Sequence, residues 1–412
     1  MFPSGLTSFQ LTIPVALRKA GHLLSFTLFI AFYTLSCTPK ATEPQPEADQ
    51  YLVSSSAVAS FTKEQLTGQV TAVNPTYALL IRQGISVVKL VYTTKNWDGS
   101  TIQASGLMLI PATTEAVPMI SQQHGTIFTE AEAPSNFGTT SEAYQYATIF
   151  ASIGYIMVCP DYIGYGASKN TPHTYEHRAS LSQASLDMIR AAREYIRGHN
   201  AIHWDARLFL AGYSEGGYAT MSLYKKIQEE VPGEFNLRAV SCGAGAYDKT
   251  SFMKALLTQP SAGVAQWNRA FLWVLLTYDQ IYKLNRPLSY YFKEPYLTDI
   301  QKNRQLATLN VSFDQVLTDT FKAGIINGTD TAFLNAVADN DIYDWKPLTT
   351  LQLYHGDADP QVYYLNSKHA YDAMQTRGAG KTVQLFTSVG KTHAQTIPDW
   401  LAGTYGLFST VQ

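Results

Sequence analysis

The sequence has 412 residues, of which 46% are apolar and 15% charged, with a net charge of −2 at pH 7. This composition supports a large buried core and excludes a disordered chain. The nearly neutral charge gives no reason to expect a nucleic acid as partner. The cysteines, Cys37, Cys159 and Cys242, do not have the spacing of metal ligands, and we predict neither a metal site nor a cofactor.

The N-terminal segment is typical of an export signal. Two basic residues, Arg18 and Lys19, precede an apolar stretch over residues 23–35. This stretch has the length of a signal-peptide core and is too short for a typical membrane-spanning helix. We therefore predict a lipoprotein-type signal peptide over residues 1–36 and export of the protein.

Cys37 directly follows the predicted signal, as in the lipobox of bacterial lipoproteins, where the cysteine becomes the acylated first residue. We predict lipidation of Cys37, which would make this lipid the only link to a membrane. Without lipidation, an ordinary signal peptide would leave the protein secreted. The polar, proline-rich residues that follow predict a tether over residues 37–60.

Two runs of alternating apolar and polar residues, 85–94 and 101–110, flank an Asp-Gly turn signal and predict an antiparallel hairpin. Later apolar runs show little alternation, as in strands that are covered on both faces. Strands that alternate with helices predict a mostly parallel, doubly wound sheet. The predicted strands are 118–122, 155–159, 207–211, 238–242, 351–354 and 383–386, and the predicted helices are 181–196, 217–231 and 364–374.

Residues 247–346 break this alternation and are rich in aromatic side chains. Because long loops without secondary structure are rare in compact domains, we predict a helical lid in this segment. The lid would be inserted into one core, formed by residues 61–246 and 347–412. Four aromatic residues are candidates for contact with the substrate: Tyr213, Trp267, Phe271 and Trp273.

The segment Gly212-Tyr-Ser-Glu-Gly216 follows a predicted strand and precedes a predicted helix. In this context a Gly-x-Ser-x-Gly pattern indicates a nucleophile elbow, a strained turn that exposes the serine hydroxyl above the sheet. Side chains at positions 212 and 216 would collide with the neighbouring strand and helix. Ser214 is therefore the predicted nucleophile.

A serine nucleophile needs a base that is oriented by an acid. In folds that carry a nucleophile elbow, the three residues follow one another along the chain in the order Ser, Asp or Glu, then His. His393 follows the last predicted strand and is the predicted base. Asp359 and Asp357 both follow strand 351–354. Asp359 is the preferred acid, and Asp357 is typical of a turn or cap residue. We expect structural roles for His355 and His369.

The predicted oxyanion hole combines two backbone N–H groups. One belongs to Glu215, the residue after the nucleophile. The other lies in the loop after strand 118–122, where Thr126 is the candidate and Gly125 the alternative. His124 in this loop has no second ligand at a suitable spacing, so we expect a structural role for it.

These segments together resemble the secretory lipases, a family of α/β-hydrolases with fungal and bacterial members. The elbow, residues 160–166, residues 173–177 and residues 185–192 carry the likeness, although Thr174 stands where the family favours proline. The resemblance implies an α/β-hydrolase fold, metal-free ester hydrolysis, and structural roles for Asp161 and Asp187. The strand order of this fold separates Cys159 from Cys242, which favours two buried thiols over a disulfide.

The leading hypothesis is a serine carboxylic ester hydrolase that acts through an acyl-enzyme on short- to medium-chain, lipid or glycan-linked esters. One alternative is a serine peptidase of the same fold, of the dipeptidyl or prolyl type. Another is a non-catalytic binding lipoprotein built on the same scaffold.

Overall fold

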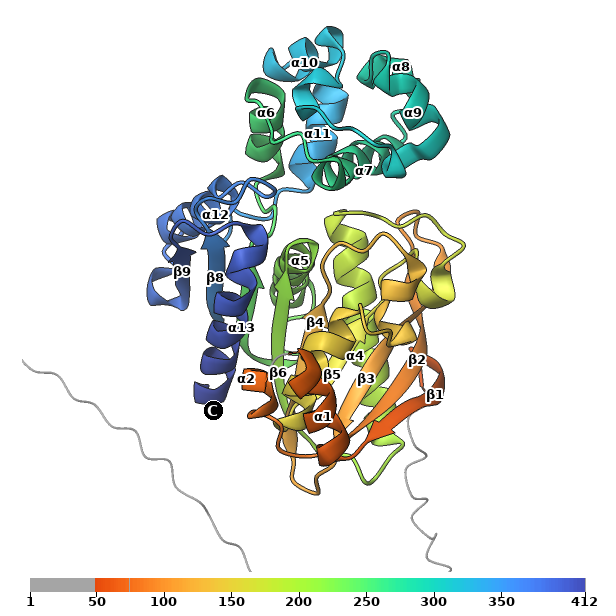
Figure 1. The fold of residues 1–412 in the computed structure, drawn as a ribbon, viewed down its shortest axis with the longest axis vertical. Helices are drawn as coiled ribbons and strands as arrows, with labels where there is room; N and C mark the ends of the chain where they lie inside the picture. The colour runs from red at the N-terminus through yellow and green to blue at the C-terminus, as the bar shows by residue number, and fades with distance from the viewer. Residues whose placement is uncertain (1–48, 74, 412) are drawn as a thin grey trace, which may run out of the picture. The chain divides into compact units, whose positions relative to one another are not determined.

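The computed structural model describes residues 49–73 and 75–411, and the described chain is organised by one nine-stranded sheet (Figure 1). The predicted signal peptide, the lipidation site Cys37 and the start of the predicted tether lie outside the described residues. The strand order is β1-β2-β3-β5-β4-β6-β7-β8-β9. The strands are β1 (Leu52–Phe61), β2 (Ile85–Lys95), β3 (Thr101–Pro111), β4 (Val117–Gln123), β5 (Ile156–Pro160), β6 (Trp204–Tyr213), β7 (Asn236–Gly243), β8 (Thr350–Gly356) and β9 (Val383–Ser388).

The sheet combines an antiparallel edge with a parallel body. Strands β2 and β3 form the predicted hairpin, in register from Ile85 opposite Pro111 to Lys95 opposite Thr101. Strand β3 also pairs antiparallel with β5, and all pairs from β5 through β9 are parallel. This mixed sheet with helices on both faces confirms the predicted α/β-hydrolase fold class.

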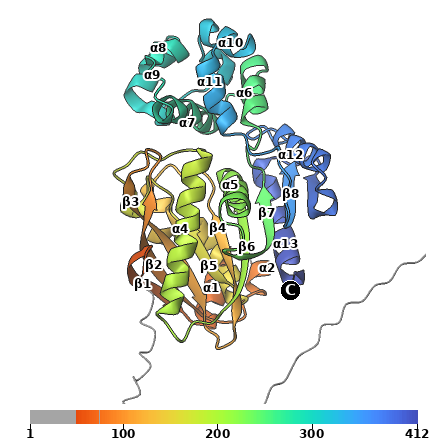
Figure 2. The same ribbon diagram turned by 180° about the vertical axis from the view of Figure 1, so that it is seen from behind.

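Helices cover both faces of the sheet (Figures 1 and 2). One face packs against α4, α5 and α12, and the other packs against α1, α3 and α13. The helices of the core are α1 (Lys63–Val73), α2 (Pro75–Ala78), α3 (Thr148–Ser152), α4 (Arg178–Arg197), α5 (Glu215–Glu230), α12 (Leu365–Thr376) and α13 (His393–Thr410). In the described part of the chain, no helix is long and apolar enough to cross a membrane.

Six helices form an insertion between β7 and β8, which Figures 1 and 2 show beyond the ends of these strands. The insertion has an apolar cluster of its own, which includes Leu272, Tyr291, Phe321 and Phe333. Its helices are α6 (Lys249–Thr258), α7 (Ala265–Ile281), α8 (Leu288–Tyr291), α9 (Tyr296–Asn303), α10 (Asp319–Ile326) and α11 (Thr331–Asp339).

Strand β1 corrects the prediction of a tether over residues 37–60, because Leu52–Phe61 pairs antiparallel with β2. Most side chains of β1 are exposed, so the segment lacks the apolar pattern that marks a strand in a sequence. Backbone pairing holds it instead. The buried carboxylate of Glu194 on α4 also accepts the N–H groups of Gln50, Tyr51 and Leu52, at 2.9, 2.9 and 2.7 Å.

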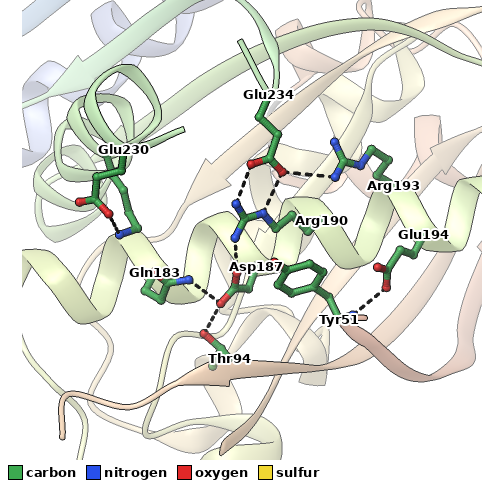
Figure 3. A network of polar contacts seen from close by, with 10 residues as sticks. Tyr51, Thr94, Gln183, Asp187, Arg190, Arg193, Glu194, Glu230 and Glu234 are labelled. Atoms are coloured by element: carbon green, nitrogen blue, oxygen red, sulfur yellow. Dashed lines mark hydrogen bonds and ion pairs between the residues drawn. The ribbon is translucent and has the colours of Figure 1, made fainter. Parts of the chain in front are cut away.

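Asp187 joins helix α4 to the sheet (Figure 3). Its carboxylate accepts hydrogen bonds from Thr94 on β2 and from Gln183, both at 2.8 Å, and from Arg190 at 3.0 Å. Arg190 in turn pairs with Glu234, two residues before the start of β7. These buried and half-buried contacts give Asp187 a structural role, as the resemblance implies.

Asp161, directly after β5, is fully buried and makes two short contacts to other parts of the core. Its carboxylate accepts the hydroxyl of Ser105 on β3 at 2.5 Å and the N–H of Ser135 at 2.7 Å. Burial raises the pKa of Asp161, and the two hydrogen bonds oppose this shift. The loop after β5 is thereby tied to strand β3.

The two described cysteines are buried thiols, as predicted. Cys159 lies on β5 and Cys242 on β7, and strands β4 and β6 stand between them. Adjacent strands are about 4.8 Å apart, so three strand spacings exceed the Cα separation that a disulfide can bridge.

Candidate active site

Ser214 occupies a sharp turn between the end of β6 and the start of α5. Its backbone has φ 60° and ψ −125°, a conformation that costs a residue with a side chain about 1–3 kcal/mol. The Ser214 N–H donates to the carbonyl of Gly243 at 2.9 Å, which fixes the turn to β7. A Cβ atom at Gly212 would overlap the carbonyl oxygen of Gly216, and one at Gly216 would overlap that of Gln123. The turn therefore requires both glycines, in agreement with the steric argument from the sequence.

Asp359 and His393 meet at the carboxyl ends of the neighbouring strands β8 and β9. Asp359 Oδ2 lies 2.6 Å from His393 Nδ1, and Oδ1 accepts the N–H groups of Gln361 and Val362 at 2.8 and 3.0 Å. Burial alone would raise the pKa of Asp359, but hydrogen bonds from His355 and His393 hold it well below its ordinary value. Asp359 is therefore an anion that orients the imidazole of His393.

The bond to Asp359 determines which nitrogen of His393 is free. A carboxylate only accepts hydrogen bonds, so Nδ1 carries the proton and Nε2 of the neutral ring is an acceptor. Nε2 is buried and has no hydrogen-bond partner among the described residues. The hydroxyl of Tyr213, the residue before Ser214, donates to the carbonyl of His393 at 2.6 Å. No hydrogen bond joins the side chains of Ser214 and His393 in the described chain.

Asp357, the other sequence candidate for the acid, lies apart from the imidazole. Its side chain is exposed, and its Oδ1 accepts the N–H of Gly390 at 2.6 Å. This bond ties the loop after β8 to the loop that carries His393. The geometry is that of a turn residue.

His355 at the end of β8 contacts Asp359, which is consistent with the structural role expected for it, although this contact was not predicted. Its Nε2 lies 2.8 Å from the carbonyl of Val362 and 3.2 Å from Asp359 Oδ2, and its Nδ1 lies 2.8 Å from the hydroxyl of Ser367. Two acceptors face Nε2, so that nitrogen carries the proton and donates to both. The position of His355 in the sequence, four residues before Asp359 at the same strand end, could have indicated this contact.

The loop after β4 brings backbone N–H groups close to Ser214. A Cβ atom at Gly125 would lie 3.7 Å from Ser214 Cβ. The Gly125 N–H itself donates to Glu142 Oε1 at 3.0 Å, so it is already engaged. Thr126 is the next residue in this loop. Glu215 occupies the first position of α5, where a backbone N–H has no acceptor within the helix. These contacts favour Thr126 over Gly125 as the second donor.

The segment from His173 to His177 contacts both candidate oxyanion residues. His173 Nε2 lies 2.9 Å from Glu215 Oε1, and the Tyr175 hydroxyl lies 2.7 Å from Thr126 Oγ1. Trp273 of α7 stacks on Tyr175, with ring centroids 4.7 Å apart and planes 5° apart. His173 Nδ1 donates to the carbonyl of Ile163 at 2.6 Å, which fixes the orientation of the ring. The family resemblance included residues 173–177, but the sequence did not indicate these contacts.

A largely apolar cavity of about 700 Å³, its mouth included, lies between Ser214 and the insertion. Of the aromatic residues predicted to contact substrate, Phe271 lines the cavity. Tyr213 is buried against His393 and Trp400, Trp273 stacks on Tyr175, and Trp267 packs in the apolar cluster of the insertion. Side chains from the insertion and its flanks that line the cavity are Lys249, Phe252, Met253, Leu256, Leu257, Ala270, Phe271, Val274, Leu275, Tyr278, Phe313, Leu317, Phe321 and Val337.

Several solved structures share the fold of this chain. A Legionella pneumophila protein described as a hydrolase candidate has 24% identity and a TM-score of 0.77, over 88% of this chain and 98% of its own. The rice cell wall degrading esterase LipA from Xanthomonas oryzae has 22% identity and a TM-score of 0.73, over 89% and 100%. Candida antarctica lipase A in its closed state has 15% identity and a TM-score of 0.60, over 87% and 83%.

The family of the chain follows from its sequence. No curated protein sequence matches significantly. The secretory lipase family matches residues 131–397, which is more than half of the chain and includes Ser214, Asp359 and His393. This chain belongs to the secretory lipase family and is a hydrolase of esters.

Proposed function

We propose that the protein is a serine carboxylic ester hydrolase with Ser214 as nucleophile, His393 as base and Asp359 as acid. The observation that carries this proposal is the state of His393. Its Nδ1 is bound to a buried carboxylate, and its Nε2 is a buried lone pair without a partner among the described residues. A nitrogen in that state, at the strand ends beside a nucleophile elbow, is suited to accept the serine proton.

The reaction proceeds through an acyl-enzyme. Ser214 Oγ attacks the acyl carbon while its proton moves to His393 Nε2, and the N–H groups of Thr126 and Glu215 donate to the oxyanion. The alcohol leaves with the proton from His393, and water then attacks the acyl-enzyme by the same route. The hydrogen bond between Ser214 and His393 forms in the substrate complex, as such bonds are often long in free enzymes.

The acyl group occupies the cavity in front of Ser214, and the insertion acts as its lid. The apolar wall supports short- to medium-chain acyl groups, whereas the alcohol, a glycan included, remains on the open side. The same wall disfavours a dipeptidyl peptidase, which would need free acidic groups for the substrate amine. The charge of Glu176, the acidic residue on this wall, is balanced by Lys249, so it is not free to balance a substrate ammonium group.

Covalent labelling with a fluorophosphonate tests the nucleophile. The wild-type protein should be labelled and should hydrolyse p-nitrophenyl butyrate, and Ser214→Ala should do neither. Ser54→Ala, which changes an exposed serine on β1, serves as the control and should behave as the wild type. Labelling that persists in Ser214→Ala would contradict the assignment, and an unreactive wild type would favour a non-catalytic binding protein.

We also propose that the protein is exported and held at a bacterial membrane by a lipid on Cys37. The description of its family as secretory supports export. The wild-type protein should partition into the detergent phase of a Triton X-114 extraction, and Cys37→Ser should partition into the aqueous phase. A Cys37→Ser protein that is exported and still enters the detergent phase would refute the lipid anchor.

A further inference from the structure

A buried ion pair interrupts the apolar wall of the cavity. Lys249 on α6 and Glu176 in the loop before α4 line the cavity together with Ser214. Their side chains are only 4% and 9% exposed, and the ammonium group of Lys249 donates to Glu176 Oε2. The pair therefore places two charged groups where the rest of the wall is mostly carbon.

Stability of the fold does not account for this pair. The loss of solvation of two buried charges offsets much of their attraction, and apolar residues of similar volume often serve a fold equally well. Burial raises the pKa of Glu176 and lowers the pKa of Lys249, and in each case the charged partner opposes the shift. An ion pair of this cost on the wall of a substrate cavity indicates a role in recognition.

The pair has hydrogen-bonding capacity that the described residues do not use. An ammonium group has three donors and a carboxylate has two acceptor oxygens. The Lys249 ammonium contacts Glu176 Oε2 and lies 4.4 Å from the centre of the Tyr218 ring. The hydroxyl of Tyr278 donates to the backbone carbonyl of Glu176, not to its carboxylate. One N–H of Lys249 and Oε1 of Glu176 are thus without a partner in the described chain.

We propose that Lys249 and Glu176 bind a hydroxyl group on the acyl part of the substrate, so that the enzyme prefers hydroxyacyl esters. This inference rests on the proposed function of Ser214. A hydroxyl both donates and accepts, and it can donate to Glu176 while it accepts from Lys249. A carboxylate or an ammonium group would instead add an unbalanced charge to a buried site. A plain acyl chain would leave the donor and the acceptor buried without partners.

Four esters test the preference: ethyl hexanoate and its 2-, 3- and 6-hydroxy derivatives, followed by pH-stat titration. We expect the wild type to hydrolyse one hydroxy ester with kcat/KM at least about tenfold above that of ethyl hexanoate, the effect of a single unpaired buried group. The double variant Lys249→Met/Glu176→Met removes both charges and both hydrogen-bonding groups at similar volume. It should lose this preference and gain activity on ethyl hexanoate.

A surface variant provides the matched control. Lys322→Met removes a lysine on α10 that pairs with the exposed Asp319 and lies outside the cavity wall, and it should keep the wild-type preference. Thermal unfolding checks that the double variant folds. If it does not, Lys249→Leu/Glu176→Leu takes its place, because it leaves neither a charge nor a polar group unpaired on the cavity wall.

Two results would overturn the hydroxyl site: a wild type that hydrolyses none of the hydroxy esters faster than ethyl hexanoate, or a preference that persists in the folded variant. A wild type that hydrolyses none of the four esters and does not react with a fluorophosphonate would instead refute the proposed function. The two failures are therefore distinguishable.

Discussion

Replacement of Asp359 by asparagine tests how the candidate triad is held. The two N–H groups of Gln361 and Val362 that donate to Oδ1 would fix the amide oxygen at that position. The amide NH₂ would then face His393 Nδ1, which becomes an acceptor, and the ring proton moves to Nε2. His393 in this tautomer cannot accept the proton of Ser214.

The expected loss is large. The same substitution in a serine protease lowers kcat about 10⁴-fold, which corresponds to about 5 kcal/mol of transition-state stabilisation. The amide would also point a donor at the protonated Nε2 of His355, now 3.2 Å from Oδ2, so some loss of stability accompanies it. The assay is kcat for p-nitrophenyl butyrate hydrolysis, together with thermal unfolding.

Asp357→Asn is the matched control for this prediction. The asparagine oxygen can still accept the N–H of Gly390, so kcat should remain within about threefold of the wild-type value because no contact with His393 is lost. A folded Asp359→Asn protein with more than a tenth of wild-type kcat would refute the reasoning. So would an Asp357→Asn protein that is equally impaired.

Three further predictions concern the cavity, the oxyanion loop and acid stability. Phe271→Trp should lower kcat/KM for octanoate esters more than for acetate esters, because added bulk in a cavity that the octanoyl chain fills costs about 1–3 kcal/mol. An unchanged ratio of the two kcat/KM values would contradict this. Tyr175→Phe removes the contact with Thr126 and should lower kcat up to about tenfold with little change in KM; an effect on KM alone would argue against a role at the oxyanion. Because the pKa of Asp359 is depressed in the folded state, its stabilisation is present above the unfolded value of about 4 and is lost as pH falls toward the folded value. In urea unfolding, the stability advantage of the wild type over Asp359→Asn should therefore shrink from pH 7 to pH 3, and a constant difference would exclude this linkage.

The sequence predicted those parts of the fold and site that depend on local chemistry. The elbow could be predicted because the close approach of neighbouring backbone requires glycine at both Gly212 and Gly216. The order of Ser214, Asp359 and His393 follows from the order of the strands that carry them. The parallel body of the sheet follows from buried runs of apolar residues.

Contacts between distant segments could not be predicted. Strand β1 has few buried side chains and depends on a carboxylate more than 140 residues away. The support that His173 and Tyr175 give to the loops around Ser214 also joins segments that are far apart in the chain. The aromatic composition of residues 247–346 did not show which rings face the cavity, since several of them, such as Trp267, pack within the insertion.

The contact between Glu194 and the start of β1 has a mechanical consequence for a chain that is held at its N-terminus. Tension applied there first reaches the exposed ion pair of Asp49 with Arg197 and then Gln50–Leu52, where three charge-assisted hydrogen bonds to Glu194 carry the load together. Beyond them, an edge strand pulled from one end peels away from β2 by one pair of hydrogen bonds at a time, from Leu52 toward Phe61. Under the proposed lipid anchor at Cys37, the contact with Glu194 would resist a pull on the N-terminus before the pairing of β1 with β2 is loaded.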